Sequence, residues 1–523
     1  MPSTLRLSTL LLALFCAATA VYGRPPESNP MEEFWRNAQT SHHFNHVRVA
    51  TADELTAAMV AAGRSGRPTI IRVAPGTYGF TQTFSSDFDT SFLPPVTTTI
   101  VIDGGNAATA TLDNASINQE APFRYFTVLK GGRLLLRNLT VKNAILECDL
   151  DDCSHDGGGA ALNGGGDLWI EDCDFTANTT LVENGSGISF GGAILNVSGD
   201  LQIERSHIDG NLSVGNGAGI ALLGGSGYIR DSTVNGNFGD RENARDSGLN
   251  EGAGIYVVNA KLRISRTTIS GNTQSQAEES AALSFGAGIY SLDSEVRLED
   301  SAIVENVDFS AGSGGGIANS GTMFIRNTTI AGNTGGSYGG GIANSGHLEL
   351  QGVTLTNNFA NSLFDDDEGN VTFPPNCSPD PGPCIGLGGG IENDPSGKVL
   401  MADTVIANNL PASPAPDCSG VLISEGHNDI GNTTGCTIQH RGSKHDELNV
   451  DPKLGGLEDD GTPGNQHYPP LANSPLIDAG DDVGESCTPR DQIGQPRVNG
   501  GPEHGHGPEC DIGAIEYQPP HRL

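Results

Sequence analysis

Two acidic strings contain the residues best suited to hold a metal ion. The first comprises Glu147, Asp149, Asp151, Asp152 and Asp156; the second is Asp365, Asp366, Asp367 and Glu368. Carboxylate oxygens are the ligands that calcium takes in proteins. Neither string has the alternating spacing of a known calcium loop, so surface hydration is the favoured interpretation. The calcium candidates are Asp149, Asp151, Asp152, Asp365, Asp366 and Asp367. No cofactor is required.

A second group of residues recurs at repeat spacing and suits sugar binding. One outward column contains Trp169, Gln202, Tyr228, Arg263, Arg297, Phe324 and Glu349. The other contains Glu171, Glu204, Arg230, Ser265, Glu299, Arg326 and Gln351. Aromatic rings stack on sugar faces and charged groups bind hydroxyls, which makes Trp169, Tyr228, Arg263, Arg297, Phe324 and Arg326 the candidate glycan-binding residues. The alternative is structural: single aromatics are common on sheets, and opposite charges one coil apart pair with each other.

The chain shows no catalytic constellation. A uronate lyase needs a cation or basic group to neutralise the carboxylate and a Lys or Arg base, and a glycoside hydrolase needs two facing carboxylates. The string GHG at 505–507 lies near the C-terminus without accompanying motifs. The catalytic residues therefore stay unknown.

The elements that position these side chains are repeats. Ile317 and Ile342 open two nearly identical strings, and the same pattern recurs from Gly157 to Asn408. Three aliphatic columns per unit, separated by Gly and Asn, predict three short strands per turn of an all-β parallel β-helix. The first column is Ala161, Ile194, Ile220, Ile255, Ile289, Ile317, Ile342 and Ile391. The second is Ile170, Ile203, Ile229, Ile264, Leu298, Ile325, Leu350 and Leu400. The third is Phe175, Ile208, Val234, Ile269, Ile303, Ile330, Leu355 and Val405.

An asparagine column closes each unit. It comprises Asn178, Asn211, Asn237, Asn272, Asn306, Asn333, Asn358 and Asn408. Asparagine tolerates the left-handed backbone of a tight corner, and stacked amides bond in a ladder. A second partial ladder is expected through Asn163, Asn196, Asn319, Asn344 and Asn393. Segments of variable length follow the first asparagine column, so all insertions are expected to leave from one corner.

The ends of the chain differ from the repeats. Residues 1–20 have the basic, apolar and small-residue pattern of an export signal, and residues 21–50 are expected to be a flexible leader. Residues 51–64 predict a helix that begins with a capping box, Thr51 and Glu54, and covers the open end of a solenoid. The solenoid is predicted over 65–410 as about eleven or twelve coils, followed by a disulfide-stapled end domain over 411–523 that covers the last coil.

Charge and cysteines indicate the environment. The net charge of −35 repels nucleic acid, and no apolar run after the signal is long enough to span a bilayer. In an oxidising compartment the sequence-local pairs are Cys377 with Cys384, Cys418 with Cys436, and Cys487 with Cys510. One cysteine among Cys148, Cys153 and Cys173 is then left over, and spacing alone does not fix the connectivity.

The repeats resemble the right-handed parallel β-helix proteins of the pectin-lyase-like superfamily. The strings SPLIDAGD, DQIGQPR and CDIGAIEY resemble the choice-of-anchor Q domain of exported bacterial proteins. Proteins with that domain often carry a surface-anchoring tail, whereas this chain ends at Leu523, so release or non-covalent retention at the surface is expected. The resemblance implies a secreted or cell-surface protein.

Three functions follow as hypotheses. The preferred one is a secreted, monomeric β-helix that binds an extracellular polysaccharide or a cell surface without catalysis. The alternatives are a calcium-assisted polysaccharide lyase or glycoside hydrolase, and a structural spacer. Fold alone does not decide between them.

Overall fold

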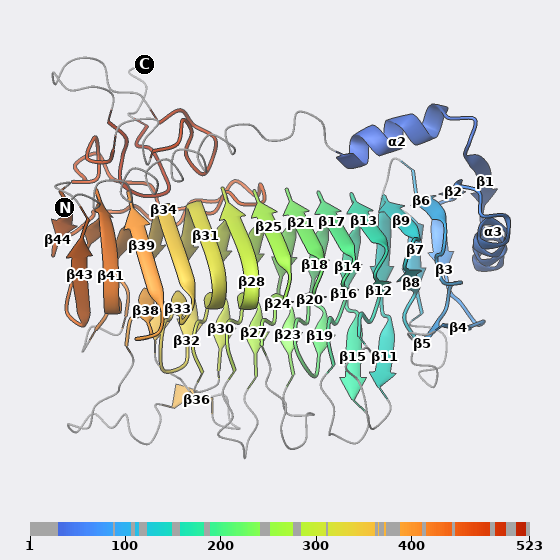
Figure 1. The fold of residues 1–523 in the computed structure, drawn as a ribbon, viewed down its shortest axis with the longest axis horizontal. Coiled ribbons are helices and arrows are strands. Elements are labelled where there is room, and N and C mark those ends of the chain that lie inside the picture. The colour runs from blue at the N-terminus through green and yellow to red at the C-terminus, as the bar shows by residue number, and fades with distance from the viewer. Residues whose placement is uncertain are drawn as a thin grey trace, which may run out of the picture.

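A computed structural model describes residues 30–86, 89–105, 110–114, 123–148, 157–182, 189–240, 251–275, 284–309, 312–360, 364–365, 371–372, 387–410, 415–441, 445–481, 487–497 and 509–518. The chain forms a right-handed parallel β-helix, with a 32-stranded and an 8-stranded sheet running along its length (Figure 1). This confirms the predicted fold class. No described helix is long and apolar enough to cross a membrane.

The strands stack in four columns, each strand pairing in parallel with its counterparts in neighbouring coils. The first column is β8 (Phe126–Leu129), β12 (Ala161–Gly164), β16 (Ile194–Val197), β20 (Ile220–Leu223), β24 (Ile255–Val258), the first parts of β28 (Ile289–Glu299) and β31 (Ile317–Ala331), β33 (Ile342–Asn344), β38 (Ile391–Asn393) and the start of β41 (Cys418–Gly426).

The middle column is β1 (Asn45–Val49), β2 (Thr69–Val73), β6 (Thr99–Asp103), β9 (Arg133–Arg137), β13 (Asp167–Glu171), β17 (Asp200–Glu204), β21 (Ser226–Arg230), β25 (Lys261–Ser265), further parts of β28 and β31, β34 (His347–Thr356), β39 (Lys398–Ala402), β41 and β43 (Cys436–His440). It therefore extends further than the predicted eleven or twelve coils.

The third column is β3 (Gly76–Tyr78), β7 (Ala110–Asp113), β10 (Leu139–Lys142), β14 (Asp174–Thr176), β18 (His207–Asp209), β22 (Thr233–Asn235), β26 (Thr268–Ser270), β29 (Ala302–Val304), the ends of β31 and β34, β40 (Val405–Ala407), β42 (Asp429–Ile430) and β44 (Glu447–Leu448).

A short fourth column, beyond the three predicted per turn, follows the asparagine corner. It contains β11 (Ile145–Cys148), β15 (Thr179–Val182), β19 (Leu212–Ser213), β23 (Phe238–Gly239), β27 (Thr273–Gln274), β30 (Val307–Asp308), β32 (Thr334–Gly335) and β35 (Phe359–Ala360). Two antiparallel hairpins lie outside the columns: β4 (Phe84–Ser86) with β5 (Asp89–Ser91), and β36 (Phe364–Asp365) with β37 (Val371–Thr372). The variable segments join the fourth column to the next first-column strand, so their ends meet at one corner as predicted.

The predicted aliphatic columns form the core. Ile220, Ile229 and Val234, one from each column of a single coil, are completely buried. Side chains alternate between the two faces of a strand, which sends one set inward and its neighbours outward. The core is thus a stack of aliphatic layers, and a solenoid needs its neighbouring coils to bury them.

The asparagine ladder is confirmed, but its conformational explanation is wrong. Asn237 donates from Nδ2 to Oδ1 of Asn272 at 2.9 Å, and Asn272 donates in the same way to Asn306 at 2.8 Å. The residue with positive φ is the one before each ladder asparagine, such as Gly236, Gly271 or Glu305. Asparagine is therefore needed for its amide, which bonds both along the stack and to the backbone.

The predicted register slips by one residue in one late coil. Leu350 pairs with Met401 rather than Leu400, and the ladder continues from Asn358 to Asn409 rather than Asn408. Ile406, not Val405, lies opposite Leu355. The turn that precedes β39 is longer than in the neighbouring repeats, which displaced the alignment.

The N-terminal end is more ordered than predicted. Residues expected to form a flexible leader contain helix α2 (Pro30–Thr40) and strand β1. Helix α3 (Ala52–Ser65) confirms the predicted cap: Thr51 Oγ1 accepts from Glu54 N, and Glu54 Oε2 accepts from Ala50 N. Leu55, Met59 and Ala62 of α3 are buried in the solenoid core.

The C-terminal end also departs from prediction. Strands β41 to β44 continue the parallel stack beyond residue 410, where the end domain was expected to begin. Much of the remaining chain then runs back along the outer side of the third column: Gly464 N donates to Thr268 Oγ1 at 2.8 Å, and Gln492 accepts from Thr329 Oγ1 at 2.7 Å. We call the described residues after β44, which are 449–481, 487–497 and 509–518, the strap, because they lie along the side of the solenoid more than over its end.

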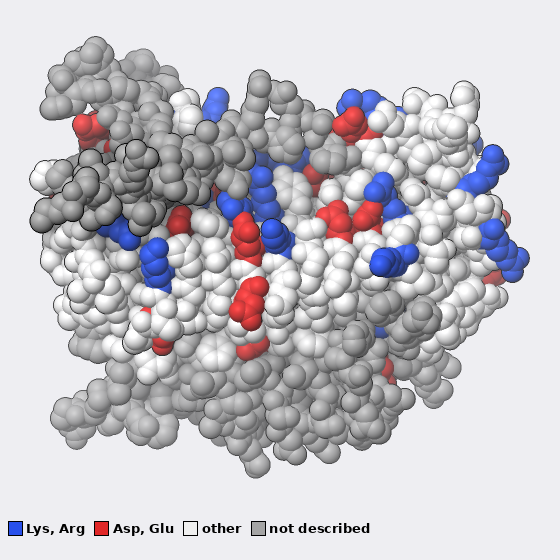
Figure 2. All heavy atoms as spheres, viewed as in Figure 1, with Lys and Arg blue, Asp and Glu red and all other residues white. Residues whose placement is uncertain are grey.

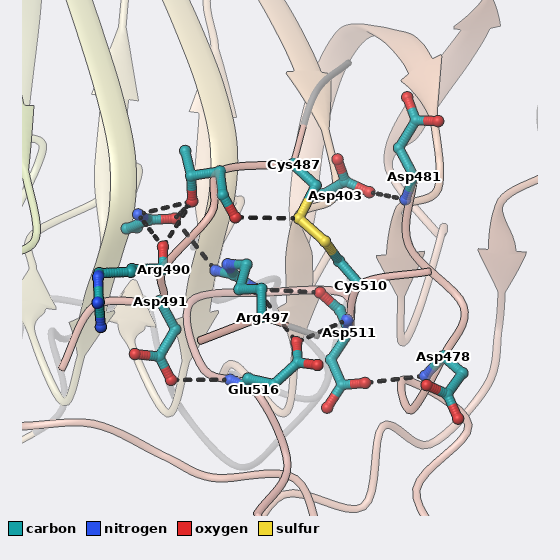
Figure 3. Close-up of a disulfide and its surroundings, with 12 residues drawn as sticks. Asp403, Asp478, Asp481, Cys487, Arg490, Asp491, Arg497, Cys510, Asp511 and Glu516 are labelled. Carbon is teal, nitrogen blue, oxygen red and sulfur yellow. Dashed lines mark hydrogen bonds and ion pairs between the residues drawn. A yellow bond between two sulfur atoms is a disulfide. The ribbon is translucent and has the colours of Figure 1, made fainter. Parts of the chain in front are cut away.

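One disulfide, Cys487–Cys510, and buried polar groups hold the strap, whereas Cys418–Cys436 joins β41 to β43. Cys418–Cys436 and Cys487–Cys510 are formed as predicted, whereas Cys377 and Cys384 lie outside the described residues. In Figure 3 the buried Arg497 lies among acidic side chains, and it donates to the carbonyl of Gly513 at 2.8 Å. Cys173 is buried and not in a disulfide; Cys153 and the side chain of Cys148 are not described.

Candidate glycan-binding face

The outward side chains of β17, β21, β25, β28, β31 and β34 form one surface, here called the middle-strand face. The strand register places Tyr228, Arg263, Arg297 and Phe324 in a single row, one residue per coil. Arg326 lies in the adjacent row, opposite Glu299. The structure therefore brings together five of the six candidate residues, and Figure 2 shows positive and negative side chains interspersed over this front surface.

Ion pairs order the arginines. Glu299 pairs with Arg263 at 3.0 Å and with Arg326 at 3.3 Å, and Glu295 binds Arg297 at 2.7 Å. These groups remain partly exposed, so each pair contributes little to stability. Its effect is to hold the guanidinium groups in fixed positions, with part of each open to solvent.

Two neighbouring side chains, Arg297 and His347, cover part of the Phe324 ring. The Arg297 guanidinium lies over its ring at 4.5 Å, and the His347 ring meets it edge-on at 6.4 Å. His347 in turn contacts Glu349 at 2.8 Å. Phe324 therefore supports Arg297 more than it offers a free stacking surface.

Tyr228 is a partly exposed aromatic candidate, and Arg266 is close enough to interact with it electrostatically. It is half-buried, and within the described part of the chain no aromatic ring or cation is placed over it. Its coil also presents Ser226, which donates to Asp200 at 2.8 Å. A partly exposed aromatic ring held on a strand suits stacking against a sugar.

Trp169 is not available as a ligand platform, which corrects the sequence prediction. It is 7% exposed and packs beneath α2, where Phe34 meets it edge-on at 5.3 Å. Arg133 covers it at 4.5 Å. The sequence of α2 gives little indication of this contact, because it lies far from Trp169 along the chain.

Several charged side chains along one edge of the middle strands pair with opposite charges in the neighbouring coils. This confirms, for these residues, the interpretation that the charges stabilise the structure. Glu171 is buried between Arg137 and Arg205, and Glu204 pairs with Arg230 at 3.2 Å. Arg205 also binds Asp172, which raises its pKa. These opposite charges one coil apart pair with each other.

The first-column strands carry a titratable cluster that sequence reasoning missed. Tyr256 and Tyr290 stack at 5.4 Å, and Glu251 beside them is buried, which raises its pKa to about 7. Glu392, further along the same column, also has its pKa raised to about 7, by burial and by Asp394. The repeated GIY string at 254–256 and 288–290 could have indicated from the sequence that the two tyrosines stack.

The calcium candidates cannot be placed. Asp149, Asp151, Asp152, Asp366 and Asp367 lie outside the described residues, and only the backbone of Asp365 is described, in β36. Among the side chains that the structure does describe, no group of three or more His, Cys, Asp or Glu residues is arranged to hold a metal ion.

Comparison with known proteins assigns no family to the chain. No family model matches the chain, and no curated protein matches it. Among solved structures, the chain is similar to the Azotobacter vinelandii mannuronan C-5 epimerase AlgE6 A-module, with 11% identity over 76% of this chain and 93% of that one. The TM-score of 0.25 is too low for that likeness to support any argument about this chain.

Proposed function

We propose that this protein binds an extracellular polysaccharide along the middle-strand face and does not cleave it. The observation that carries the proposal is the row of outward side chains from Gln202 through Tyr228, Arg263 and Arg297 to Glu349. Coils are spaced by about 4.8 Å, so a rigid array of polar and aromatic groups faces solvent at regular intervals. A linear polymer of sugar rings matches such an array.

The chemistry of the row suits a glycan. Tyr228 offers an apolar ring for stacking, and the partly exposed Arg263 and Arg297 offer donors for hydroxyl or carboxylate oxygens. The overall charge of −35 repels polyanions, whereas on this face Arg263, Arg297 and Arg326 offset the charges of Glu295 and Glu299 and so reduce the local repulsion.

The ion pairs favour binding over cleavage. In a lyase an arginine or lysine must give up its proton to act as the base, and a neighbouring carboxylate stabilises the charged form instead. Arg263, Arg297 and Arg326 each contact a glutamate. Catalysis by a lyase or hydrolase is therefore the second candidate rather than the first.

The proposal includes an extracellular location. Two described disulfides are typical of proteins from oxidising compartments. We take residues 1–20 as an export signal, the C-terminal strap as choice-of-anchor Q-like, and the protein as a monomer at the cell surface or free outside the cell.

A polysaccharide panel with matched variants tests the proposal. We expect one or more polysaccharides to bind, and Tyr228→Ala to weaken that binding at least about tenfold, a loss of about 1.4 kcal/mol. Phe238→Ala is the control, because Phe238 is an exposed aromatic in the same coil but on the eight-stranded sheet. Binding should be measured with and without calcium, together with new reducing ends and unsaturated uronate absorbance.

Each outcome decides between the hypotheses. Binding without products, weakened by Tyr228→Ala and not by Phe238→Ala, supports the proposal. Product formation that Arg263→Ala or Arg297→Ala abolishes would establish an enzyme instead. Failure to bind any polysaccharide would leave the structural spacer as the better hypothesis.

A further inference from the structure

The outward row of the middle strands is aliphatic and buried in the first coils, and it becomes polar or aromatic from β17 onward. In β2, β6 and β9 the central outward residue is Ile70, Val101 or Leu135, and all three are completely buried. Trp169 in β13 follows, and from β17 onward the same row contains Gln202 and Tyr228. Outward aliphatic side chains on a strand require a cover, whereas the later polar residues do not.

Helix α2 is that cover. Its apolar residues Met31, Phe34, Trp35 and Ala38 have the i, i+3, i+4, i+7 spacing of one helix face and pack on this part of the row. Figure 1 shows α2 beside the N-terminal strands of the solenoid. The later middle strands lie beyond it.

Helix α2 also covers cationic groups of the strand surface. The Arg137 guanidinium lies 4.5 Å from the Trp35 ring, and that of Arg133 lies 5.4 Å from the Phe34 ring. Aromatic rings from α2 thus occupy cationic groups of the same strand surface. Asp200 lies where the covered part of the row meets the open part. Its Oδ2 accepts from Trp169 Nε1 at 3.3 Å and from Gln202 Nε2 at 2.8 Å.

We infer that α2 is an end stop for the polysaccharide, so that a bound chain must end or leave the surface beside Gln202. This inference rests on the proposed function. The open row runs from Gln202 to Glu349, and Leu400, which follows it, is buried again. Six positions spaced by about 4.8 Å accommodate about five or six sugar rings. Phe34 and Trp35 are the residues that set this limit.

Affinity as a function of oligosaccharide length tests the end stop. Fragments of increasing length, prepared from the polysaccharide that binds best, should gain affinity up to about six units and then reach a plateau. The double variant Phe34→Ala/Trp35→Ala should release α2 and expose the row from Trp169 toward Ile70. Its plateau should move to chains longer by up to about four units, with affinity for the longest chains increased about fivefold or more.

Two further proteins keep the test decisive. Glu33→Ala changes an exposed residue of α2 and should keep the wild-type plateau. A protease site inserted after His42, in the turn between α2 and β1, allows the helix to be cut away after the chain has folded with it in place. The cleaved protein should show the longer plateau of the double variant.

The outcomes separate the two proposals. Affinity that keeps rising beyond about eight units in the wild type, or an unchanged plateau in the cleaved protein, would overturn the end stop while leaving glycan binding intact. Absence of binding at every length in every protein would overturn the proposed function, and the end stop with it.

Discussion

At the scale of single residues, burial decides what a polar side chain does in this solenoid. Asp429 is completely buried on β42, and among the described residues neither carboxylate oxygen has a hydrogen-bond partner. Burial raises its pKa to about 8, and repulsion from Glu447, Asp417 and Asp451 contributes to the shift. The folded state therefore binds a proton at pH values where the unfolded chain has released it.

We expect Asp429→Asn to stabilise the protein at alkaline pH. The pKa is raised on folding, so the destabilisation by Asp429 is absent below the unfolded value of about 4 and grows as pH rises toward about 8. The variant should gain on the order of 2 kcal/mol in unfolding free energy at pH 8 and little at pH 4. Denaturant titrations at both pH values measure this. Asp293→Asn, at an exposed position of β28, is the matched control, and an equal gain there would contradict the explanation.

The ladder asparagines act through both ends of their amides. Asn272 Oδ1 accepts from Asn237 Nδ2, and its own Nδ2 donates to Asn306 and to the Val234 carbonyl. Asn272→Ala leaves several buried groups unpaired, and we expect a loss of about 3 kcal/mol or more in unfolding free energy. Asn235→Ala, at the end of β22, loses one partly buried bond, which Asn235 Oδ1 accepts from Ser270 N, and should cost about 1 kcal/mol. Equal losses of unfolding free energy for Asn272→Ala and Asn235→Ala would show that the ladder contributes no more to stability than an ordinary side-chain hydrogen bond.

At the scale of elements, strand register determines which side chains reach the core. Tyr228, Arg263 and Arg297 share the middle-strand face because consecutive coils pair without a shift there. In the later coil, the longer turn before β39 moves every residue by one position. A slip of one residue exchanges the two faces of a strand, so sequence alignment alone places such a coil incorrectly.

We expect Met401→Lys to be far more harmful than Lys398→Ala. Met401 is 1% exposed and packs in the core opposite Leu350, so a buried unpaired ammonium should cost on the order of 3 kcal/mol or more. Lys398 begins the same strand and is exposed, so its replacement should change the unfolding free energy by less than about 0.5 kcal/mol. Similar expression yields and melting temperatures for the two variants would contradict the register.

At the scale of the whole molecule, titratable groups are buried in several places. Burial raises the pKa of Glu251 and Glu392 to about 7, of Asp511 to about 6 and of Glu516 to about 8. Glu516 and Asp511 lie in the strap, where Asp511 N donates to Glu516 at 3.1 Å. Arg497 is the nearby cation (Figure 3).

These groups predict that the protein is most stable in weak acid. Each carboxyl has a higher pKa folded than unfolded, so the folded state binds more protons between about pH 4 and pH 8, and stability falls as pH rises through that window. The melting temperature should be higher at pH 5 than at pH 8, and Glu516→Gln should reduce the difference. Differential scanning calorimetry across this range measures it; a melting temperature that rises steadily to pH 8 would contradict the prediction.

The amino-acid sequence by itself determined the solenoid, its aliphatic columns, its asparagine ladders and the capping box of α3, because each of these depends on local spacing that repeats along the chain. It also aligned Tyr228, Arg263, Arg297, Phe324 and Arg326 on one face, since alternation along a strand is a local property. Only the tertiary structure decided that α2 covers Trp169, that Arg297 lies over Phe324 and that the strap runs back to Thr268. The contacts of α2 and of the strap join segments far apart in the sequence, and Arg297 packs on Phe324 of the next coil by shape and charge that no periodicity records.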